Sequence, residues 1–345
     1  MISCNDRPLR VFQVTNMWPS EQRPNWGVFI RSQVQSLPSV GVENVGFYEI
    51  EGWRGKWRYL QAMWQLPRAI AAAKPDLVHI HYGLSVLSAA LVRGRPLVVS
   101  YCGNDVLGEP DSAGRLSRSS VFMSRWCIAA GRRADAVIVK SEEMRVPLAG
   151  FTQVEVIPNG VDLSLFRPRD RAASRAELGW PQDVPILLFP ANPEEPRKNW
   201  PCAKACAELL RAQGVEVRLE WIYRKPQQLI ATAMSAADVL LNPSFHEGSP
   251  NVVKEAMACG LPIVSADCGD VRSRLAGCAP GAVVERTPEA FAAAVRDVLA
   301  ANSRSNGPEM IAPLALDAVA RRVRTVYETA IRRRHSRQLA PETAL

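Results

Sequence analysis

Two glutamates are the residues best suited to chemistry, because one short segment holds both at defined places. Residues 237–260 have the pattern of a strand, a loop and a short helix, with Glu247 on the loop and Glu255 on the helix. Carboxylates accept hydrogen bonds from hydroxyl groups. The two acids could therefore hold different parts of one polyhydroxylated ligand.

The start of that helix is a predicted anion site. Ser249 is the expected N-cap, Pro250 the first helical residue and Gly260 the end of the helix. A loop that leaves a parallel strand and enters a helix presents unpaired N–H groups and the positive end of the helix dipole, which favour a diphosphate. The amides expected to contact it are those of Asn251, Val252 and Val253.

A larger α/β framework must position these residues, and the sequence shows its pattern. Short, continuous apolar runs alternate with helical segments, which is typical of parallel strands covered by helices on both faces. The first predicted strands are Leu9–Thr15, Leu77–His81, Leu97–Tyr101 and Ala136–Lys140, with a helix over Gly27–Ser36. The second set is Ile186–Pro190, Val217–Ile222, Val239–Asn242 and Pro262–Ala266. The predicted fold class is α/β, with two doubly wound Rossmann-like domains.

Turn-forming residues between the two sets mark the connection. Val156–Asp162 combines a strand end with Pro, Asn and Gly, so we place the hinge there. We expect a first domain over residues 1–165, a second over 166–313 and an amphipathic helix over 314–335. The apolar stripe of that helix predicts packing on its own domain or back on the first domain, with a membrane surface as a third option.

Length and composition limit the classes of protein. A chain of 345 residues, 47% hydrophobic and 22% charged, fits two soluble globular domains. The net charge of +8 is spread along the chain, which argues against nucleic acid and predicts attraction for anions such as a phosphorylated substrate or an anionic membrane. We see neither a secretory signal nor a membrane span, so a cytoplasmic location is expected, with peripheral contact at the inner face of the membrane left open. The Cys spacing predicts buried thiols.

The residues around the two glutamates also resemble a known family. The matching segments are Ala237-Asp238, Pro243-Ser244, the run from Glu255 to Val264, and Ile157–Asp162 near the hinge. Together they resemble the family 4 retaining glycosyltransferases, whose hallmark is two Glu separated by seven residues. The resemblance covers nearly the whole chain and implies the GT-B architecture, in which two Rossmann-like domains face each other across a cleft. The segment Glu247–Glu255 is similar to a subgroup tied to bacterial surface polysaccharides of the teichuronic-acid type.

The resemblance implies roles for several residues. Glu255 would bond the ribose of a sugar nucleotide, and Glu247 the hydroxyls of the donor sugar. A Lys is expected against the diphosphate, and Lys198 fits its position. Asn192 replaces the family's usual Arg, so either Arg197 supplies the second positive charge or the leaving group is held by one cation fewer. The expected donor-binding set is Gly27, Arg197, Lys198, Glu247, Gly248, Ser249, Asn251, Val252, Val253 and Glu255.

The first domain is expected to form the acceptor side. Cys102 stands where many members of that family carry His, so catalysis through an imidazole is not expected there. Asp105 is either an acceptor-side group or a helix N-cap, and His81 either faces the cleft or packs in the core. We expect His79 and His81 to point to opposite faces of their strand and therefore not to chelate one ion. The expected acceptor-side set is Cys102, Gly103, Asn104, Asp105 and His81, and the expected catalytic set is Glu247, Lys198, Arg197 and Asp105.

The resemblance therefore implies retaining transfer of a sugar from a nucleoside-diphosphate sugar to a hydroxyl of a glycan or lipid-linked acceptor. The chain has no close Asp-x-Asp pair to hold a divalent cation against a diphosphate, so no metal cofactor is expected. Two rival hypotheses are a nucleotide-sugar epimerase or hydrolase on the same scaffold, and a non-catalytic scaffold for polysaccharide assembly.

Overall fold

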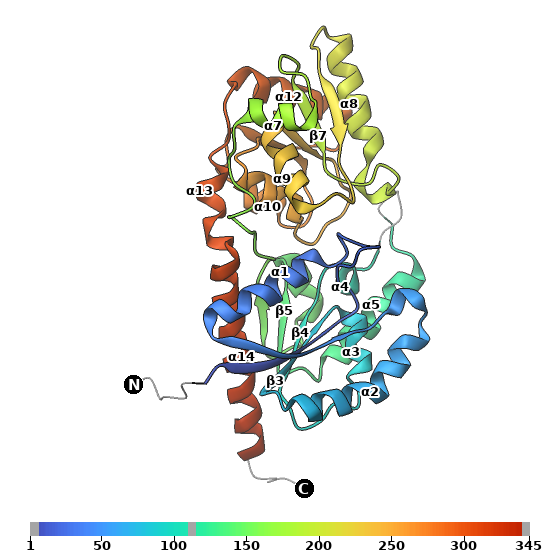
Figure 1. Ribbon diagram of the computed structural model, residues 1–345. Coiled ribbons are helices and arrows are strands. Elements are labelled where there is room, and N and C mark those ends of the chain that lie inside the picture. Colours follow the sequence, from blue (N-terminus) through green and yellow to red (C-terminus); the bar gives the residue numbers. More distant parts are fainter. Residues whose placement is uncertain (1–6, 110–114, 340–345) are drawn as a thin grey trace.

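A computed structural model describes residues 7–109 and 115–339 of the chain. It contains two parallel sheets, one in each half of the sequence (Figure 1). The first has the strand order β2-β1-β3-β4-β5-β6 and the second β11-β10-β9-β7-β8. All strand pairs are parallel. These two doubly wound sheets confirm the predicted fold class.

The first domain contains the longer sheet. Its strands are β1 (Leu9–Thr15), β2 (Val42–Glu49), β3 (Leu77–His81), β4 (Leu97–Ser100), β5 (Ala136–Val139) and β6 (Val154–Val156). Its helices are α1 (Val28–Ser36), α2 (Trp57–Ala73), α3 (Gly83–Ser88), α4 (Asn104–Leu107), α5 (Arg118–Gly131) and α6 (Glu142–Arg145), with 3-10 turns η1 (Leu37–Val40), η2 (Gly52–Arg54) and η3 (Val146–Leu148).

The second domain repeats the arrangement. Its strands are β7 (Ile186–Phe189), β8 (Arg218–Trp221), β9 (Val239–Asn242), β10 (Ile263–Ala266) and β11 (Gly281–Val284). Its helices are α7 (Arg171–Leu178), α8 (Trp200–Ala212), α9 (Gln227–Ala236), α10 (Asn251–Ala258), α11 (Val271–Leu275), α12 (Pro288–Ala301) and α13 (Gly307–Ile311), with η4 (Pro196–Lys198) and η5 (Ala312–Leu314). A long final helix, α14 (Leu316–Leu339), follows.

Helices cover both faces of the first sheet, which explains its continuously apolar strands. Val11 and Val98 belong to the core cluster that includes α14, whereas their neighbours Phe12 and Val99 belong to the cluster that includes α2 and α5. Successive side chains of a strand point to opposite faces. Both sets must therefore be apolar, and β4 and β5 are buried along their whole length.

The C-terminal helix α14 returns to the first domain, the second of the placements left open by the sequence. It packs against α1, η1, β4 and β5 (Figure 1). Tyr327 on its buried stripe contacts His79 Nδ1 through its hydroxyl at 2.7 Å. Because that stripe is buried inside the protein, it does not bind a membrane surface.

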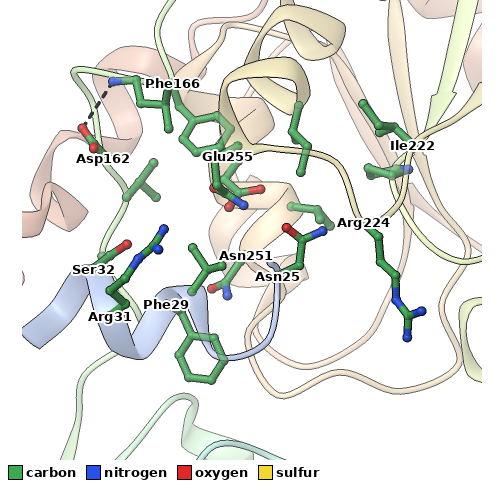
Figure 2. A pocket seen from close by; sticks show the side chains of 18 of the residues that line it. Asn25, Phe29, Arg31, Ser32, Asp162, Phe166, Ile222, Arg224, Asn251 and Glu255 are labelled. Atoms are coloured by element: carbon green, nitrogen blue, oxygen red, sulfur yellow. Dashed lines mark hydrogen bonds between the residues drawn. The ribbon is translucent and has the colours of Figure 1, made fainter. Parts of the chain in front are cut away.

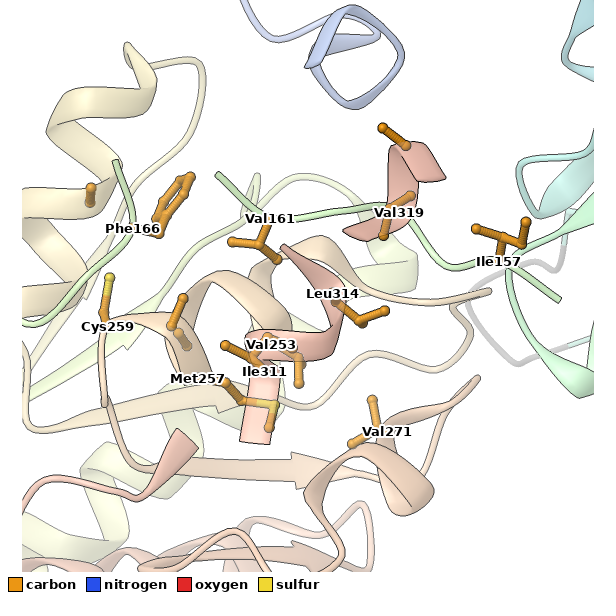
Figure 3. Packing of buried hydrophobic residues seen from close by; sticks show 14 of the residues in the cluster. Ile157, Val161, Phe166, Val253, Met257, Cys259, Val271, Ile311, Leu314 and Val319 are labelled. Carbon is orange, nitrogen blue, oxygen red and sulfur yellow. The ribbon is translucent and has the colours of Figure 1, made fainter. Parts of the chain in front are cut away.

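The two chain crossings between the domains pair with each other. Val161 N donates to Leu314 O at 2.8 Å, and Leu316 N donates to Val161 O at 3.1 Å. Figure 3 shows Ile157, Val161 and Leu314 in one apolar cluster with Met257 of α10. The hinge is therefore packed directly onto the helix that carries Glu255.

Over the described ranges, 7–109 and 115–339, no helix combines the length and apolar character needed to cross a bilayer.

Candidate active site

Glu247 lies at the centre of a charged cluster beside the cleft. Lys198 Nζ is 2.6 Å from its Oε1, and Arg197 Nη1 is 2.9 Å from its Oε2. Arg197 also donates to His246 O at 2.9 Å and to Glu195 Oε1 at 2.6 Å. Burial alone would raise the pKa of Glu247, but the charges of Lys198 and Arg197 outweigh burial and lower it. Glu247 is therefore a firmly ionised carboxylate.

Two turns bring these three residues together. Lys198 and Arg197 lie on η4, just after β7, and Glu247 follows β9, the neighbouring strand of the sheet. Phe245 N donates to Arg197 O at 2.9 Å, which fixes one loop against the other. Carboxyl ends of adjacent parallel strands meet at one sheet edge, so residues distant in sequence converge there.

Asn192 does not join this cluster. Its Oδ1 accepts from Glu194 N at 3.1 Å, within its own turn. Arg197 instead stands with Lys198 against Glu247, which favours Arg197 as the second positive charge of the site.

Glu255 lies apart from this cluster, in a cavity of about 330 Å³ between the domains. Figure 2 shows Glu255 and Asn251 of α10 on the opposite side of the cavity from α1, the helix that carries Phe29 and Arg31. Burial raises the pKa of Glu255 to about 7, and the Lys254 charge opposes that rise only in part. Other cavity-lining residues include Asn25, Asp162, Phe166, Tyr223 and Arg224.

The N-terminal loop closes this cavity by reaching the second domain. With its side-chain amide oriented so that donors face acceptors, Asn25 donates to Lys225 O at 3.0 Å and accepts from Arg224 N at 3.0 Å. Gly27 follows on the same loop with φ +72°, and a Cβ there would lie 2.4 Å from Met17 O. The packing of the loop is therefore enough by itself to require a glycine at this position.

The start of α10 differs from the prediction by one residue. The helix begins at Asn251, and its N-cap is Pro250, which makes no side-chain cap bond. The expectation that Ser249 caps the helix is wrong, because its Oγ donates to Asp270 Oδ2 at 3.0 Å instead. The first amides of α10, including those of Val252 and Val253, consequently have no side-chain cap, which suits an anion.

Lys254 is a site residue that the sequence interpretation missed. It is almost completely buried, and its Nζ donates to Asn159 O and to Ser249 Oγ, both at 3.2 Å. Burial lowers its pKa to about 7. Lys254 therefore connects the hinge to the loop between β9 and α10, which we call the donor loop. The sequence feature that could have identified it is a lysine on the apolar side of a short amphipathic helix.

Asp105 has a positioning role on the acceptor side. Its carboxylate accepts from the backbone N–H groups of Gly83 at 2.7 Å, Gly103 at 2.8 Å and Cys102 at 3.0 Å. It is buried, and burial raises its pKa although these bonds oppose the rise. Gly103, not Asp105, is the N-cap of α4, which Asn104 begins. Asp105 therefore organises two loops, and the bonds from their amides occupy the carboxylate that was expected to act on the acceptor side.

The Cys102 thiol is a poor candidate for acid–base chemistry. Burial and the Asp105 charge raise its pKa to about 12, so it stays protonated near neutrality. Its carbonyl is better placed, because a Cβ built on Gly248 would lie 3.6 Å from Cys102 O and 3.5 Å from Gly103 Cα. The acceptor-side loop and the donor loop thus meet across the cleft.

His81 packs in the core, which is the second of the two placements left open by the sequence, so it does not belong with the expected acceptor-side residues. Its Nε2 is 3.0 Å from Gln13 Oε1, and burial lowers its pKa to about 3. The rings of His79 and His81 lie 4.0 Å apart, so these residues share a face of β3. Residues two apart on a strand point the same way, and the expectation of opposite faces was an error.

Gly269 is a second residue that the sequence interpretation missed. With φ +58°, a Cβ there would lie 2.5 Å from Gly248 O and 2.7 Å from Glu247 O. Gly269 packs directly against the backbone of the donor loop, so it determines the position of Glu247.

Within the described part of the chain, no group of three or more His, Cys, Asp or Glu side chains is arranged to hold a metal ion.

Comparison with known proteins matches both halves of the chain to glycosyltransferases. The family described as Glycosyltransferase Family 4 matches residues 9–165, and Glycosyl transferases group 1 matches residues 192–301. D-inositol 3-phosphate glycosyltransferase of Nocardia farcinica is 29% identical over 250 residues, covering 61% of this chain and 55% of that protein. The protein of that name from Segniliparus rotundus is 27% identical over 343 residues, covering 84% and 72%. The chain thus spans little more than half of the first relative.

Solved structures share the fold over nearly the whole chain. Sucrose-phosphate synthase from Thermosynechococcus elongatus has a TM-score of 0.73 at 20% identity, covering 93% of this chain and 98% of that one. Anabaena Alr3699/HepE in complex with UDP-glucose has a TM-score of 0.61 at 16% identity, covering 95% and 100%. At such identities the likeness establishes the two-domain GT-B fold. Neither relative above is named for teichuronic-acid synthesis, so that narrower expectation has no support.

Proposed function

We propose that the chain is a glycosyltransferase of the family 4 type, which transfers a sugar from a nucleoside-diphosphate sugar to an acceptor hydroxyl with retention of anomeric configuration. The observation that carries this proposal is the pairing of Lys198 and Arg197 with Glu247, beside the uncapped start of α10. Cations and free amides suit a diphosphate, and a fixed carboxylate suits sugar hydroxyls.

The chemistry assigned to these residues follows from their charges. Breaking the bond between sugar and diphosphate places negative charge on the departing oxygen, and Lys198 and Arg197 would stabilise that charge. Glu247 would orient the sugar through its hydroxyls, and Glu255 would accept hydrogen bonds from the ribose in the cavity of about 330 Å³. These groups need no metal ion, so we propose a metal-independent reaction with the sugar nucleotide as co-substrate.

The acceptor we propose is a polyhydroxylated molecule bound against the Cys102–Asp105 loop. Two classes compete for this place. One is the glycan or lipid-linked acceptor that the sequence resemblance implies. The other is a phosphorylated inositol, which the names of the relatives favour, and the basic net charge of +8 suits its phosphate.

A nucleotide screen followed by a transfer assay tests the proposal. UDP, GDP and ADP are compared by thermal shift, since a ligand at a hundred times its dissociation constant adds about 2.7 kcal/mol of stability. The matching sugar nucleotide is then offered with inositol phosphate or with a lipid-linked glycan, with and without EDTA, and the product is followed by mass spectrometry and its anomeric form by NMR.

Each outcome has a defined meaning. We expect acceptor-dependent transfer that survives EDTA, and Lys198→Met should lower kcat about a hundredfold or more, as the loss of one such donor does. Equal consumption of the donor without any acceptor would overturn transfer in favour of hydrolysis or epimerisation. The absence of any nucleotide-dependent thermal shift would instead favour a non-catalytic scaffold.

A further inference from the structure

An aromatic stripe runs along the outward face of α2. Its core side is formed by Ala62, Leu66 and Ile70. On the opposite side Trp57, Leu60 and Trp64 are 54%, 62% and 68% exposed, at spacings that align them on one face. A surface helix normally turns polar residues to solvent. The outward face of α2 is therefore apolar where a polar one is expected.

Helix α5 shows the same reversal. Ser124, Cys127 and Gly131 face the core, while Phe122 and Trp126 are 60% and 52% exposed. The rings of Phe122 and Trp126 lie 6.0 Å apart. Because α3 contacts both α2 and α5, these helices lie in the same layer of the first domain, away from α14 (Figure 1). We call these stripes together the α2–α5 face. Exposed apolar groups gathered in this way mark an interaction site.

The charge around the α2–α5 face is mainly positive, and the acid beside it is Glu51, which pairs with Arg54 at 3.3 Å and with Arg58 at 3.6 Å. Between Glu51 and Asp76 the sequence has no acidic residue, and its basic residues are Arg54, Lys56, Arg58, Arg68 and Lys74. Between Asp111 and Asp135 it again has none, and its basic residues are Arg115, Arg118, Arg125, Arg132 and Arg133. Guanidinium groups also lie over the rings, with Arg58 Cζ 4.3 Å from the Trp57 centroid and Arg54 Cζ 4.7 Å from the Trp53 centroid.

We propose that the α2–α5 face docks on an anionic lipid bilayer. Trp and Arg are the residues that suit the boundary between headgroups and acyl chains, where rings enter the apolar layer and guanidinium groups meet phosphates. A second copy of this chain is a poor occupant, since a symmetric contact would place two mainly positive faces against each other. The positive charge also selects anionic over neutral lipids.

This face adjoins the cleft. Arg23 Cζ lies 3.9 Å from the Trp53 ring centroid, and Trp53 lies on η2, the turn before α2. Arg23 belongs to the N-terminal loop whose Asn25 lines the donor cavity. A docked first domain would therefore hold that loop close to the membrane surface. Membrane binding by this face is independent of the reaction proposed above, so either can fail alone.

Vesicle flotation of the full chain tests the proposal. Vesicles of phosphatidylcholine alone are compared with vesicles that also contain phosphatidylglycerol, and brominated lipids report insertion by quenching Trp fluorescence. We expect binding only to the anionic vesicles, with quenching, and weaker binding as salt rises. Trp57→Gln/Trp64→Gln should lower the partition coefficient about a hundredfold, from the apolar area that no longer enters the lipid. Arg118→Gln/Arg125→Gln should lower it about thirtyfold.

The matched control is Trp221→Gln, because Trp221 is 52% exposed on β8 of the second domain. This variant should bind like the wild type. The substituted side chains point to solvent, so thermal unfolding should not change; if the Trp57→Gln/Trp64→Gln variant unfolds, Phe122→Gln/Trp126→Gln serves in its place. Three results would each overturn the proposal. They are equal binding to both vesicle types, wild-type binding by Trp57→Gln/Trp64→Gln, and a dimer in solution that Trp57→Gln/Trp64→Gln abolishes.

Discussion

Replacing Glu247 by Gln should tighten the binding of a nucleoside diphosphate while slowing sugar transfer. Lys198 Nζ is 2.6 Å and Arg197 Nη1 2.9 Å from the Glu247 carboxylate, so one acid neutralises both cations that we assign to the diphosphate. A free nucleoside diphosphate has no sugar for Glu247 to hold. The nucleoside diphosphate therefore loses no contact when the carboxylate becomes an amide. It also meets two cations whose positive charge is no longer neutralised by Glu247.

The size of the gain follows from the geometry. A phosphate oxygen at an ordinary distance of about 2.8 Å from Lys198 Nζ stands about 5 Å from Glu247, which gives about 3 kcal/mol of repulsion at an effective dielectric constant of about 20. Water screens part of this, because the Glu247 side chain is 12% exposed. We expect about half to remain, which is about a tenfold increase in affinity.

Isothermal titration calorimetry with UDP or GDP, whichever gives the larger thermal shift, measures this change. The matched control is Glu195→Gln, because Glu195 also bonds Arg197 at 2.6 Å but its side chain is 36% exposed. Its effect on affinity should stay within about twofold, as for other exposed ion pairs. In the transfer assay Glu247→Gln should lower kcat, since the sugar is no longer oriented.

Two results would refute this reasoning. If Glu247→Gln binds the nucleoside diphosphate more weakly than wild type, the carboxylate does not neighbour the diphosphate. If Glu195→Gln reproduces the gain, the effect comes from net charge and not from the placement of Glu247.

Other changes test separate parts of the site. Burial raises the pKa of Glu255 from 4.5 to about 7, so nucleotide affinity measured by calorimetry should rise as the pH is raised through 7, and Glu255→Gln should lose this rise. The same shift lowers the free energy of unfolding as the pH rises from 4.5 to 7. Gly269→Ala should lower kcat, because its Cβ would lie 2.5 Å from Gly248 O, while Gly214→Ala, with φ +81° and nothing within 4 Å, should cost only stability in a denaturant titration. Tyr327→Phe should lower the free energy of unfolding by about 1–2 kcal/mol, since His79 Nδ1 loses its partner at 2.7 Å; an unchanged denaturation midpoint would contradict this.

Most of the strands that the sequence predicted are buried along nearly their whole length; β8 is the exception, since it lies at a sheet edge with exposed ends and was predicted as well. β4 and β5 are buried on both faces, so every residue had to be apolar and the pattern was unambiguous. β2, β6 and β11 were not predicted. They lie at sheet edges, where partly exposed positions admit polar residues and break the continuous apolar run.

The same distinction separates the site residues. Glu247 and Glu255 could be identified because a motif fixes them within one strand, loop and helix. Lys254 lies inside that motif, yet its contact is Asn159 O, 95 positions away in the chain. The local sequence pattern predicts the type of secondary structure. Only the packing of the hinge onto α10 shows that the buried ammonium group of Lys254 connects the hinge to this helix.

Asp105 shows the limit of arguing a role from residue type. A carboxylate after a strand in a cleft is a reasonable candidate to meet a ligand hydroxyl, and the sequence could not exclude it. In the structure its oxygens are taken by the amides of Gly83, Cys102 and Gly103. Those amides come from loops after two adjacent strands, β3 and β4, so their convergence depends on strand order, which the sequence does not state. The carboxylate shapes the loop that faces Gly248.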